Sequence, residues 1–224
     1  MSALGLDGFT KGWVAVRLDD DRRSISFPSS ISEALSIGFD QVAIDIPIGL
    51  NDNGIRGCDL QARERLRPHG SRVFTGARRW LWEEFDDPDK ANREALRRNQ
   101  KRISRQLWCL GRKITEVDEF VLAHRHLKVC ETHPELVFLR LNGGAPLPSK
   151  HKPEGLALRR HLLSAQGFTE LDVWLDKTRV GKGAKRDDVL DACAAAIAAR
   201  DMANSVPEGT PPQDSKKLPM QIWY

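Results

Sequence analysis

Short apolar segments separated by polar turns fill the first thirty positions of this 224-residue chain. Three segments are apolar or alternate between apolar and polar residues: 3–7, 12–18 and 24–27. Alternation with a period of two is typical of strands, and spacers rich in Gly, Asp and Arg are typical of hairpin turns. The pattern therefore predicts three consecutive strands joined by short connections.

A brief helix and a buried strand are expected next. The helix is predicted over 31–38, with Ser30 or Ser32 as its N-cap. The strand is predicted over 41–50, where a mostly apolar run contains Asp45. The first fifty residues thus have the order strand, strand, strand, helix, strand.

A region over about 51–124 interrupts this arrangement. Its first part is rich in Gly, Pro and Arg, which predicts loops with a short helix around 59–67. A single long helix is expected from about Asp89 to Ala123, because apolar residues recur there every three or four positions. These apolar residues are Ile103, Leu107, Leu110, Ile114, Val117 and Val121. We interpret the region as a mostly helical insertion.

The rest of the chain returns to strands and helices. A strand is expected over 127–138, a helix over 156–167 and an alanine-rich helix from about 187 to 204. A proline-rich tail follows at 205–224. Together these elements predict an α/β fold in a single domain over 1–204, with a mixed five-stranded sheet and helices on both of its faces.

Composition excludes several classes of protein. Hydrophobic residues make up 40% of the chain and charged residues 29%, which predicts a folded core rather than disorder. No apolar run approaches the ~18 residues of a membrane span, and the N-terminus does not resemble a secretory signal. Four scattered cysteines without a CxxC pair argue against a zinc ribbon or a disulfide framework, and we expect a cytoplasmic protein.

Positive charge is concentrated in the predicted insertion. Residues 56–113 hold 16 Lys and Arg against 8 Asp and Glu, whereas the remaining residues hold 19 against 23. A basic segment of this kind indicates a polyanion such as DNA or RNA as the partner. A solvated helical surface explains the same charge equally well.

Four aspartates from three predicted elements are candidate metal ligands. Asp7 ends the first strand, and Asp45 lies inside the strand that follows the first helix. Asp188 and Asp191 are three residues apart, so they share one helix face. Carboxylate oxygens are the ligands that Mg²⁺ or Mn²⁺ requires. Two such ions about 3.5–4 Å apart activate a water and stabilise the leaving oxygen of a phosphodiester.

Each aspartate also has a simpler explanation. Asp187 is best interpreted as a helix cap, and Asp188 could have the same role. Asp191 lies beyond the cap and should face either solvent or a site. Asp45 is the strongest anomaly, because an aspartate in an apolar strand is unfavourable unless a metal, an arginine or a strand end accounts for it. Asp7 alone could simply begin a turn.

Two further groups of residues are candidates for the site. Glu131 and His133 lie on one face of an extended chain, where Glu131 is a possible further ligand and His133 a general base or phosphate contact. Basic residues are candidates for substrate binding through phosphate: Arg56, Arg63, Lys150 and Arg159. The alternative for Arg56 and Arg63 is an internal ion-pair network with Asp59.

An ordered set of motifs between about residues 3 and 200 carries a family resemblance. The motifs are GLDG, GW, AIDIPIGL, RGCDLQAR, ISRQLW, ETHPE and DDVLDA. They resemble the domain-of-unknown-function 429 (DUF429) family, whose members are predicted nucleases of the ribonuclease H-like superfamily and similar to RuvC-type resolvases. The resemblance implies a three-layer α/β/α fold. It also implies that the active-site acids are Asp7, Asp45, Asp188 and Asp191.

We therefore expect a nuclease or phosphodiesterase that uses Mg²⁺ or Mn²⁺ to hydrolyse nucleic acid. The main alternative is a non-catalytic nucleic-acid-binding or interaction module on the same fold. A phosphotransferase of the actin-like or sugar-kinase class is a weaker candidate, since the chain has only one loop, LDGFTKG, that resembles a phosphate-binding hairpin. The sequence leaves the substrate and the oligomeric state open, a homodimer included.

Overall fold

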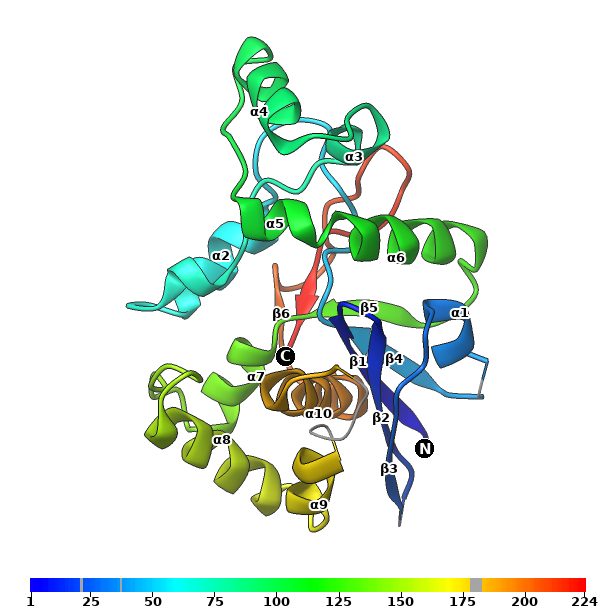
Figure 1. The fold of residues 1–224 in the computed structure, drawn as a ribbon, viewed down its shortest axis with the longest axis vertical. Helices are drawn as coiled ribbons and strands as arrows, with labels where there is room; N and C mark the ends of the chain where they lie inside the picture. Colours follow the sequence, from blue (N-terminus) through cyan, green and yellow to red (C-terminus); the bar gives the residue numbers. More distant parts are fainter. Residues whose placement is uncertain (21, 37, 178–182) are drawn as a thin grey trace. The chain divides into compact units, whose positions relative to one another are not determined.

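The computed structural model describes residues 1–224 apart from positions 21, 37 and 178–182. The described chain forms two compact units (Figure 1). The first unit consists of Met1–Ile46, His126–Asn204 and Trp223–Tyr224. The second consists of Pro47–Arg125 and Ser205–Ile222. Among the described helices, none combines the length and the hydropathy of a membrane span.

The predicted order of the first elements is confirmed. Three strands come first: β1 (Ala3–Phe9), β2 (Gly12–Leu18) and β3 (Arg23–Ser26). The short helix α1 (Ile31–Ala34) and the strand β4 (Gln41–Ile44) follow. Ser30 caps α1, since its Oγ accepts a hydrogen bond from the Glu33 backbone N–H at 3.1 Å. Figure 1 shows strands β1 and β2 with their sequence neighbours α1 and β4 in the first unit.

The sheet is mixed and has seven strands among the described residues, not five as predicted. The strand order is β3-β2-β1-β4-β5-β7-β6. Strands β1, β2 and β3 pair antiparallel, whereas β1, β4 and β5 (Val129–Thr132) pair parallel. The two unpredicted strands are β6 (Ser205–Val206) and β7 (Ile222–Trp223). Two residues are too few to show an alternating pattern, so the proline-rich composition of this segment concealed them.

The strand expected over 127–138 is also shorter than predicted. Strand β5 ends at Thr132, and Pro134 begins the helix α7 (Pro134–Leu141). The fixed φ of proline suits the first position of a helix, which explains the change at this point. Two further helices of the first unit follow it: α8 (Pro153–Ala165) and α9 (Leu171–Lys177).

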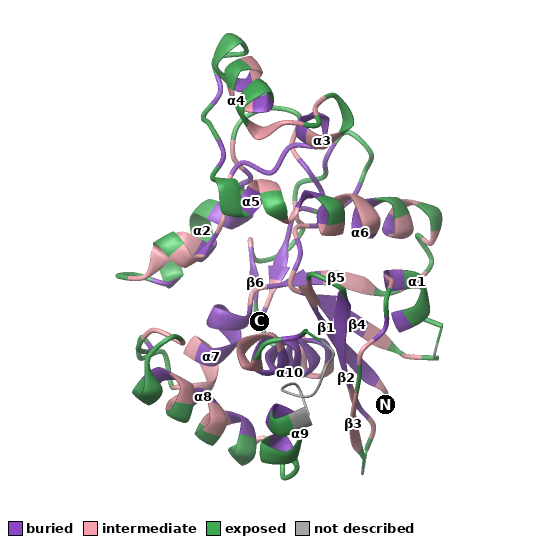
Figure 2. Ribbon diagram, viewed as in Figure 1, coloured by how far each residue is buried: buried purple, intermediate pink, exposed green. Residues whose placement is uncertain are grey.

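The alanine-rich helix α10 (Arg186–Asp201) packs directly on the sheet and contacts β1, β2 and β4. A Cβ atom added at Gly5 of β1 would lie 2.0 Å from the Ala196 nitrogen and 2.4 Å from the Ala192 oxygen. The backbones of helix and strand therefore touch, which requires glycine on one side and alanine on the other. Figure 2 shows α10 as the mostly buried helix of the first unit.

The single helix expected from Asp89 to Ala123 is wrong. The structure has three helices in its place: α4 (Pro88–Arg97), α5 (Arg105–Cys109) and α6 (Gly111–Ala123). Asn99 has a positive φ of 55°, and the Asn92 side chain bonds both the N–H and the carbonyl of Ile103. Ser104 then caps α5. These side chains satisfy the backbone groups that a continuous helix would have paired internally.

The remaining helices of the second unit are short. They are α2 (Gly57–Arg65), a 3₁₀ helix at Gly70–Arg72 and α3 (Trp80–Glu83).

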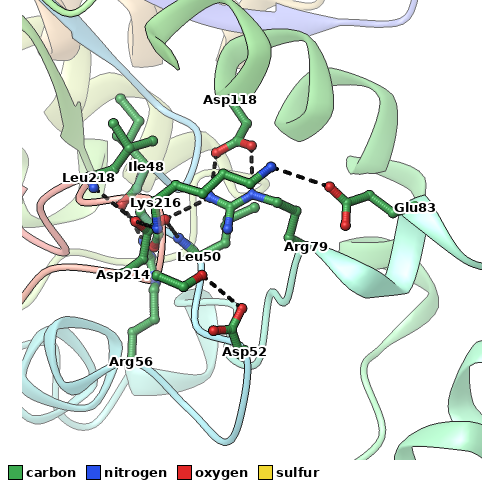
Figure 3. A network of polar contacts seen from close by, with 12 residues as sticks. Ile48, Leu50, Asp52, Arg56, Arg79, Glu83, Asp118, Asp214, Lys216 and Leu218 are labelled. Carbon is green, nitrogen blue, oxygen red and sulfur yellow. Dashed lines mark hydrogen bonds and ion pairs between the residues drawn. The ribbon is translucent and has the colours of Figure 1, made fainter.

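A buried ion network connects distant segments of the second unit (Figure 3). The Arg79 guanidinium donates to both Asp118 carboxylate oxygens, at 2.8 and 2.9 Å, and to Asp214 at 2.6 Å. Asp214 also accepts hydrogen bonds from the backbone N–H groups of Leu50 and Leu218. The network thus joins α6, the chain after β4 and the C-terminal segment.

We predict that Gly5→Ala lowers the free energy of unfolding by about 1–3 kcal/mol or more, the usual effect of overpacking a core. The added methyl group would collide with the α10 backbone, which cannot move away as a flexible side chain can. Chemical denaturation with circular dichroism measures the change. Gly57→Ala is the matched control, because a Cβ atom there meets nothing within 4 Å. Equal stability of the two variants would contradict the close contact between helix and strand.

Candidate carboxylate site

Asp7 and Asp45 lie on neighbouring strands of the sheet. Strands β1 and β4 run parallel with Leu6 opposite Ile44, so the next residue of each chain is an aspartate. The Asp45 N–H donates to the Leu6 carbonyl at 3.0 Å, which continues the pairing one residue past β4. Asp45 therefore follows the strand instead of lying within it, and Asp7 lies within β1 instead of ending it. The register places the two aspartates side by side on adjacent segments.

The beginning of α10 brings two more aspartates. The N-cap residue is Lys185, not Asp187, because the helix begins at Arg186. Asp188 Oδ2 accepts a hydrogen bond from the Lys185 N–H at 2.7 Å, so it serves the helix end as well as the site. Burial raises the pKa of Asp188 to about 6, although this hydrogen bond acts in the opposite direction.

Burial and mutual repulsion change the titration of the aspartates on the sheet. The pKa of Asp7 is raised well above its usual range, first by burial and then by the charges of Asp45, Asp191 and Asp188. The pKa of Asp45 is raised to about 8 by burial and by Asp191. The charges of Asp45, Asp191 and Asp188 all act on Asp7, and we refer to these four aspartates as the carboxylate cluster.

Lys150 partly neutralises this cluster. Its Nζ lies 2.5 Å from Asp191 Oδ2 and 3.8 Å from an oxygen of Asp187. Burial would lower the pKa of Lys150, but the charge and hydrogen bond of Asp191 outweigh it and raise the pKa. The pKa of Asp191 is itself raised, because its burial outweighs the opposing effect of Lys150.

The other oxygen of Asp191 has no such partner. Asp191 is 5% exposed, and its Oδ1 is buried without a hydrogen bond to any residue that the structure describes. A buried carboxylate oxygen without a donor is unfavourable, and it is available to a cation or a polar ligand.

Glu131 does not join the four aspartates. In the strand register, Glu131 of β5 pairs with Ile44 of β4, and Ile44 pairs with Leu6 of β1. These three residues therefore share one face of the sheet. Side chains alternate between the two faces along a strand, and Gly5 of β1 faces α10. Asp7, two residues later, therefore lies on the α10 face. Glu131 shares the face of Leu6 and lies on the opposite one. His133 is the N-cap residue of α7 and has an extended backbone.

Glu135, which sequence reasoning missed, acts on the carboxylate cluster through its charge. The charge of Glu135 contributes to the raised pKa of Asp45 and of Asp191, after the larger effect of burial. Glu135 forms an ion pair with Arg159 at 2.7 Å, and Arg159 is fully buried. Its place in the first turn of a helix opened by proline was the available signal, but that position equally suits a simple cap.

The predicted basic ligands for substrate lie in different surroundings. Lys150 belongs to the cluster, and Arg159 is paired inside the first unit. Arg56 and Arg63 belong to the second unit. Arg56 and Asp59 are each 1% exposed and form an ion pair, which confirms the internal interpretation for this pair. The Arg63 Nε donates to the Val73 carbonyl at 3.1 Å.

The donor set fits a divalent cation in its chemistry. Asp7, Asp45, Asp188 and Asp191 offer carboxylate oxygens, and Asp191 Oδ1 is open. Within the described part of the chain, however, no three or more His, Cys, Asp or Glu side chains are arranged to hold a metal ion. The Lys150 ammonium lies on Asp191 in this arrangement. Metal binding would therefore require side chains to move.

We predict that Asp45→Asn stabilises the metal-free protein more at about pH 8 than at about pH 4. The folded protein holds this proton up to a pKa of about 8, whereas an unfolded chain loses it near 3.9. The free energy of unfolding of the wild-type protein therefore falls as the pH rises between these values. The gain at pH 8 should be about 2 kcal/mol, less than the full shift implies because solvent screens a partly exposed group.

Urea unfolding at both pH values measures this difference. Asp86→Asn serves as the control, since Asp86 is an exposed carboxylate of the second unit. An Asp45→Asn variant that is equally or less stable at both pH values would show that Asp45 carries no unfavourable charge in the folded protein.

Comparison with known proteins gives one match. No curated protein and no solved structure matches the chain. One family model, described as "Protein of unknown function (DUF429)", matches residues 5–215. This match confirms the resemblance seen in the sequence motifs. It covers nearly the whole chain and includes all four clustered aspartates, and the chain therefore belongs to the DUF429 family.

Proposed function

We propose that this protein is a divalent-metal-dependent nuclease or related phosphodiesterase. One observation carries the proposal: three separate segments bring four aspartates into one partly buried electrostatic cluster, in which Asp7 and Asp191 are buried and Asp191 has an open oxygen. Clustered buried carboxylates are unfavourable for folding, and strongly shifted pKa values are concentrated at functional sites. A cation that the cluster binds would remove this unfavourable charge.

The order of the elements supports a ribonuclease H-like fold. The resemblance implies three strands, a helix, a further strand, and an acid pair at the start of the final helix. The chain has β1, β2, β3, α1 and β4 in this order, and α10 carries the acid pair. Family membership supports the same fold. None of the four cysteines, all of which the structure describes, forms a disulfide, which agrees with a reducing compartment such as the cytoplasm.

The chain's own residues would divide the work at the site. Asp7 and Asp45 are fixed by strand pairing, so they supply oxygens at set positions. Asp188 is oriented by the Lys185 N–H, and Asp191 presents its open oxygen from the next turn of α10. Mg²⁺ or Mn²⁺ would neutralise developing charge on a phosphodiester and assist attack by water.

Exposed basic side chains of the second unit support a polyanionic substrate. On α4 and the segment after it they are Arg93, Arg97, Arg98, Lys101, Arg102 and Arg105. Some of these side chains form ion pairs at the surface, such as Arg97 with Glu94 and Arg105 with Asp89. Exposed ion pairs of this kind contribute little to stability. These cations remain able to bind phosphates, and such binding weakens as salt increases.

A non-catalytic nucleic-acid-binding module is the second candidate. The observation that favours it is the Lys150 ammonium on Asp191, which compensates the cluster without any metal. In that case the aspartates would be a structural ion network. Binding without cleavage, unaffected by EDTA, distinguishes this function from the first.

We predict that the purified protein cleaves labelled single- or double-stranded DNA or RNA when Mg²⁺ or Mn²⁺ is present and not in EDTA. Asp45→Asn and Asp191→Asn should each lower the rate at least about 100-fold, the effect of removing one electrostatic group from a catalytic site. Asp86→Asn should retain the wild-type rate, because its carboxylate is exposed and in the second unit.

Gel electrophoresis of end-labelled substrates measures the cleavage. Activity that survives in Asp45→Asn would show that another site is responsible. No cleavage of any of the four substrate types with either metal would leave the binding module as the better account.

A further inference from the structure

The Lys150 ammonium is a positive charge in contact with acids at the start of α10. It contacts Asp191 and Asp187, two acids of the helix start. Burial has the largest effect on the pKa of Asp7, Asp45 and Asp188, but the Lys150 charge acts on all three in the opposite direction. One ammonium therefore acts on all four aspartates and partly neutralises their charge.

Contacts with helix α8 hold the backbone around Lys150 in place. The Arg159 Nη1 donates at 2.9 Å to the carbonyl of Pro148, two residues before Lys150. A Cβ atom added at Gly155 would lie 2.1 Å from the Ser149 oxygen, so α8 approaches this segment very closely. Arg159 itself is held by Glu135 of α7. The position of Lys150 is thus determined by buried contacts and not by chance placement of a surface lysine.

The segment holds the backbone, but the ammonium can leave. The Lys150 side chain is 30% exposed, and its four-carbon stem is flexible. By contrast, Asp191 is buried on an internal helix and cannot follow it. Removal of the ammonium would free the second Asp191 oxygen, which together with Oδ1 would present a complete carboxylate to a cation.

We propose that Lys150 is a tethered counter-ion of the carboxylate site, and that a divalent cation binds there by displacing its ammonium from Asp191. This inference rests on the proposed metal-dependent function. It gives Lys150 a role in regulating metal occupancy, because the ammonium and the metal compete for the same carboxylate. It also explains how the described side chains can fit a metal chemically without forming a ligand sphere.

Competition has a consequence that a structural role does not have. Loss of a merely structural lysine would weaken the site, whereas loss of a competing cation strengthens metal binding. Lys150→Met should bind Mn²⁺ about tenfold more tightly than the wild type or better, since a hydrogen bond between charged groups contributes at least that factor. The metal-free variant should melt at a lower temperature than the wild type, and saturating Mn²⁺ should raise its melting temperature by more.

Isothermal titration of the full chain with MnCl₂ at one fixed pH tests the proposal. Lys152→Met is the matched control, because it removes an equal charge from an exposed position two residues away. Its Mn²⁺ affinity should equal that of the wild type. If thermal melting shows that Lys150→Met is unfolded, Lys150→Gln takes its place.

The outcomes separate the two proposals. If Lys150→Met binds Mn²⁺ more tightly than the wild type and Lys152→Met does not, the counter-ion role is supported. The same holds if Lys150→Met binds Mn²⁺ and the wild type does not bind it detectably. Equal or weaker binding in Lys150→Met, with wild-type binding abolished by Asp191→Asn, overturns the counter-ion and leaves the metal site standing. If neither the wild type nor either Lys150 variant binds Mn²⁺, the metal-dependent function is contradicted. The displacement of the Lys150 ammonium by a metal is then contradicted as well.

Discussion

The contact between the α10 backbone and Gly5 is the constraint on which the first unit depends. Without a side chain at Gly5, the helix approaches β1 until its backbone at Ala192 and Ala196 touches the strand. Asp191 immediately precedes Ala192, and Asp7 lies two residues beyond Gly5 on the same face of the sheet. The close packing of helix on strand therefore also sets the distance between acids from opposite ends of the chain. A bulkier helix would separate them.

This arrangement concentrates negative charge where water screens it only in part. Burial raises the pKa of Asp7, Asp45 and Asp191, and repulsion among the carboxylates adds to the effect. The fold tolerates the charge because Lys150 supplies a cation on a segment that Arg159 and Gly155 hold in place. Because the lysine offsets part of this charge, the protein can remain folded without metal. Four aspartates without such a cation would destabilise the folded protein. The same compensation sets the affinity with which a metal must compete.

Much of the first unit could be predicted because its signals are local. Apolar alternation predicted β1 to β3, and an acid out of place in an apolar run identified Asp45. The pairing of Lys150 with Asp191 could not be predicted, because 41 residues separate them and basic residues are common on surfaces. The same reason concealed the pairing of Glu135 with Arg159.

Local periodicity also misled in places. The apolar stripe over 103–121 continues past Leu110, where α5 ends and α6 begins, so a pattern of period 3.6 concealed these two helix ends. Glu131 was a candidate for the site because an extended chain places it on one face with His133. Its strand register, which only the pairing with β4 reveals, places it on the opposite face. Sequence thus identified acids with unusual surroundings, but the fold decided which of them meet.

The most direct test of this account is a crystal structure of the protein grown with Mn²⁺, with the ion located by its anomalous scattering. The account predicts Mn²⁺ bound between Asp7, Asp45 and the α10 aspartates, with the Lys150 ammonium moved away from Asp191. An empty carboxylate cluster at saturating Mn²⁺, with Lys150 still on Asp191, would contradict it.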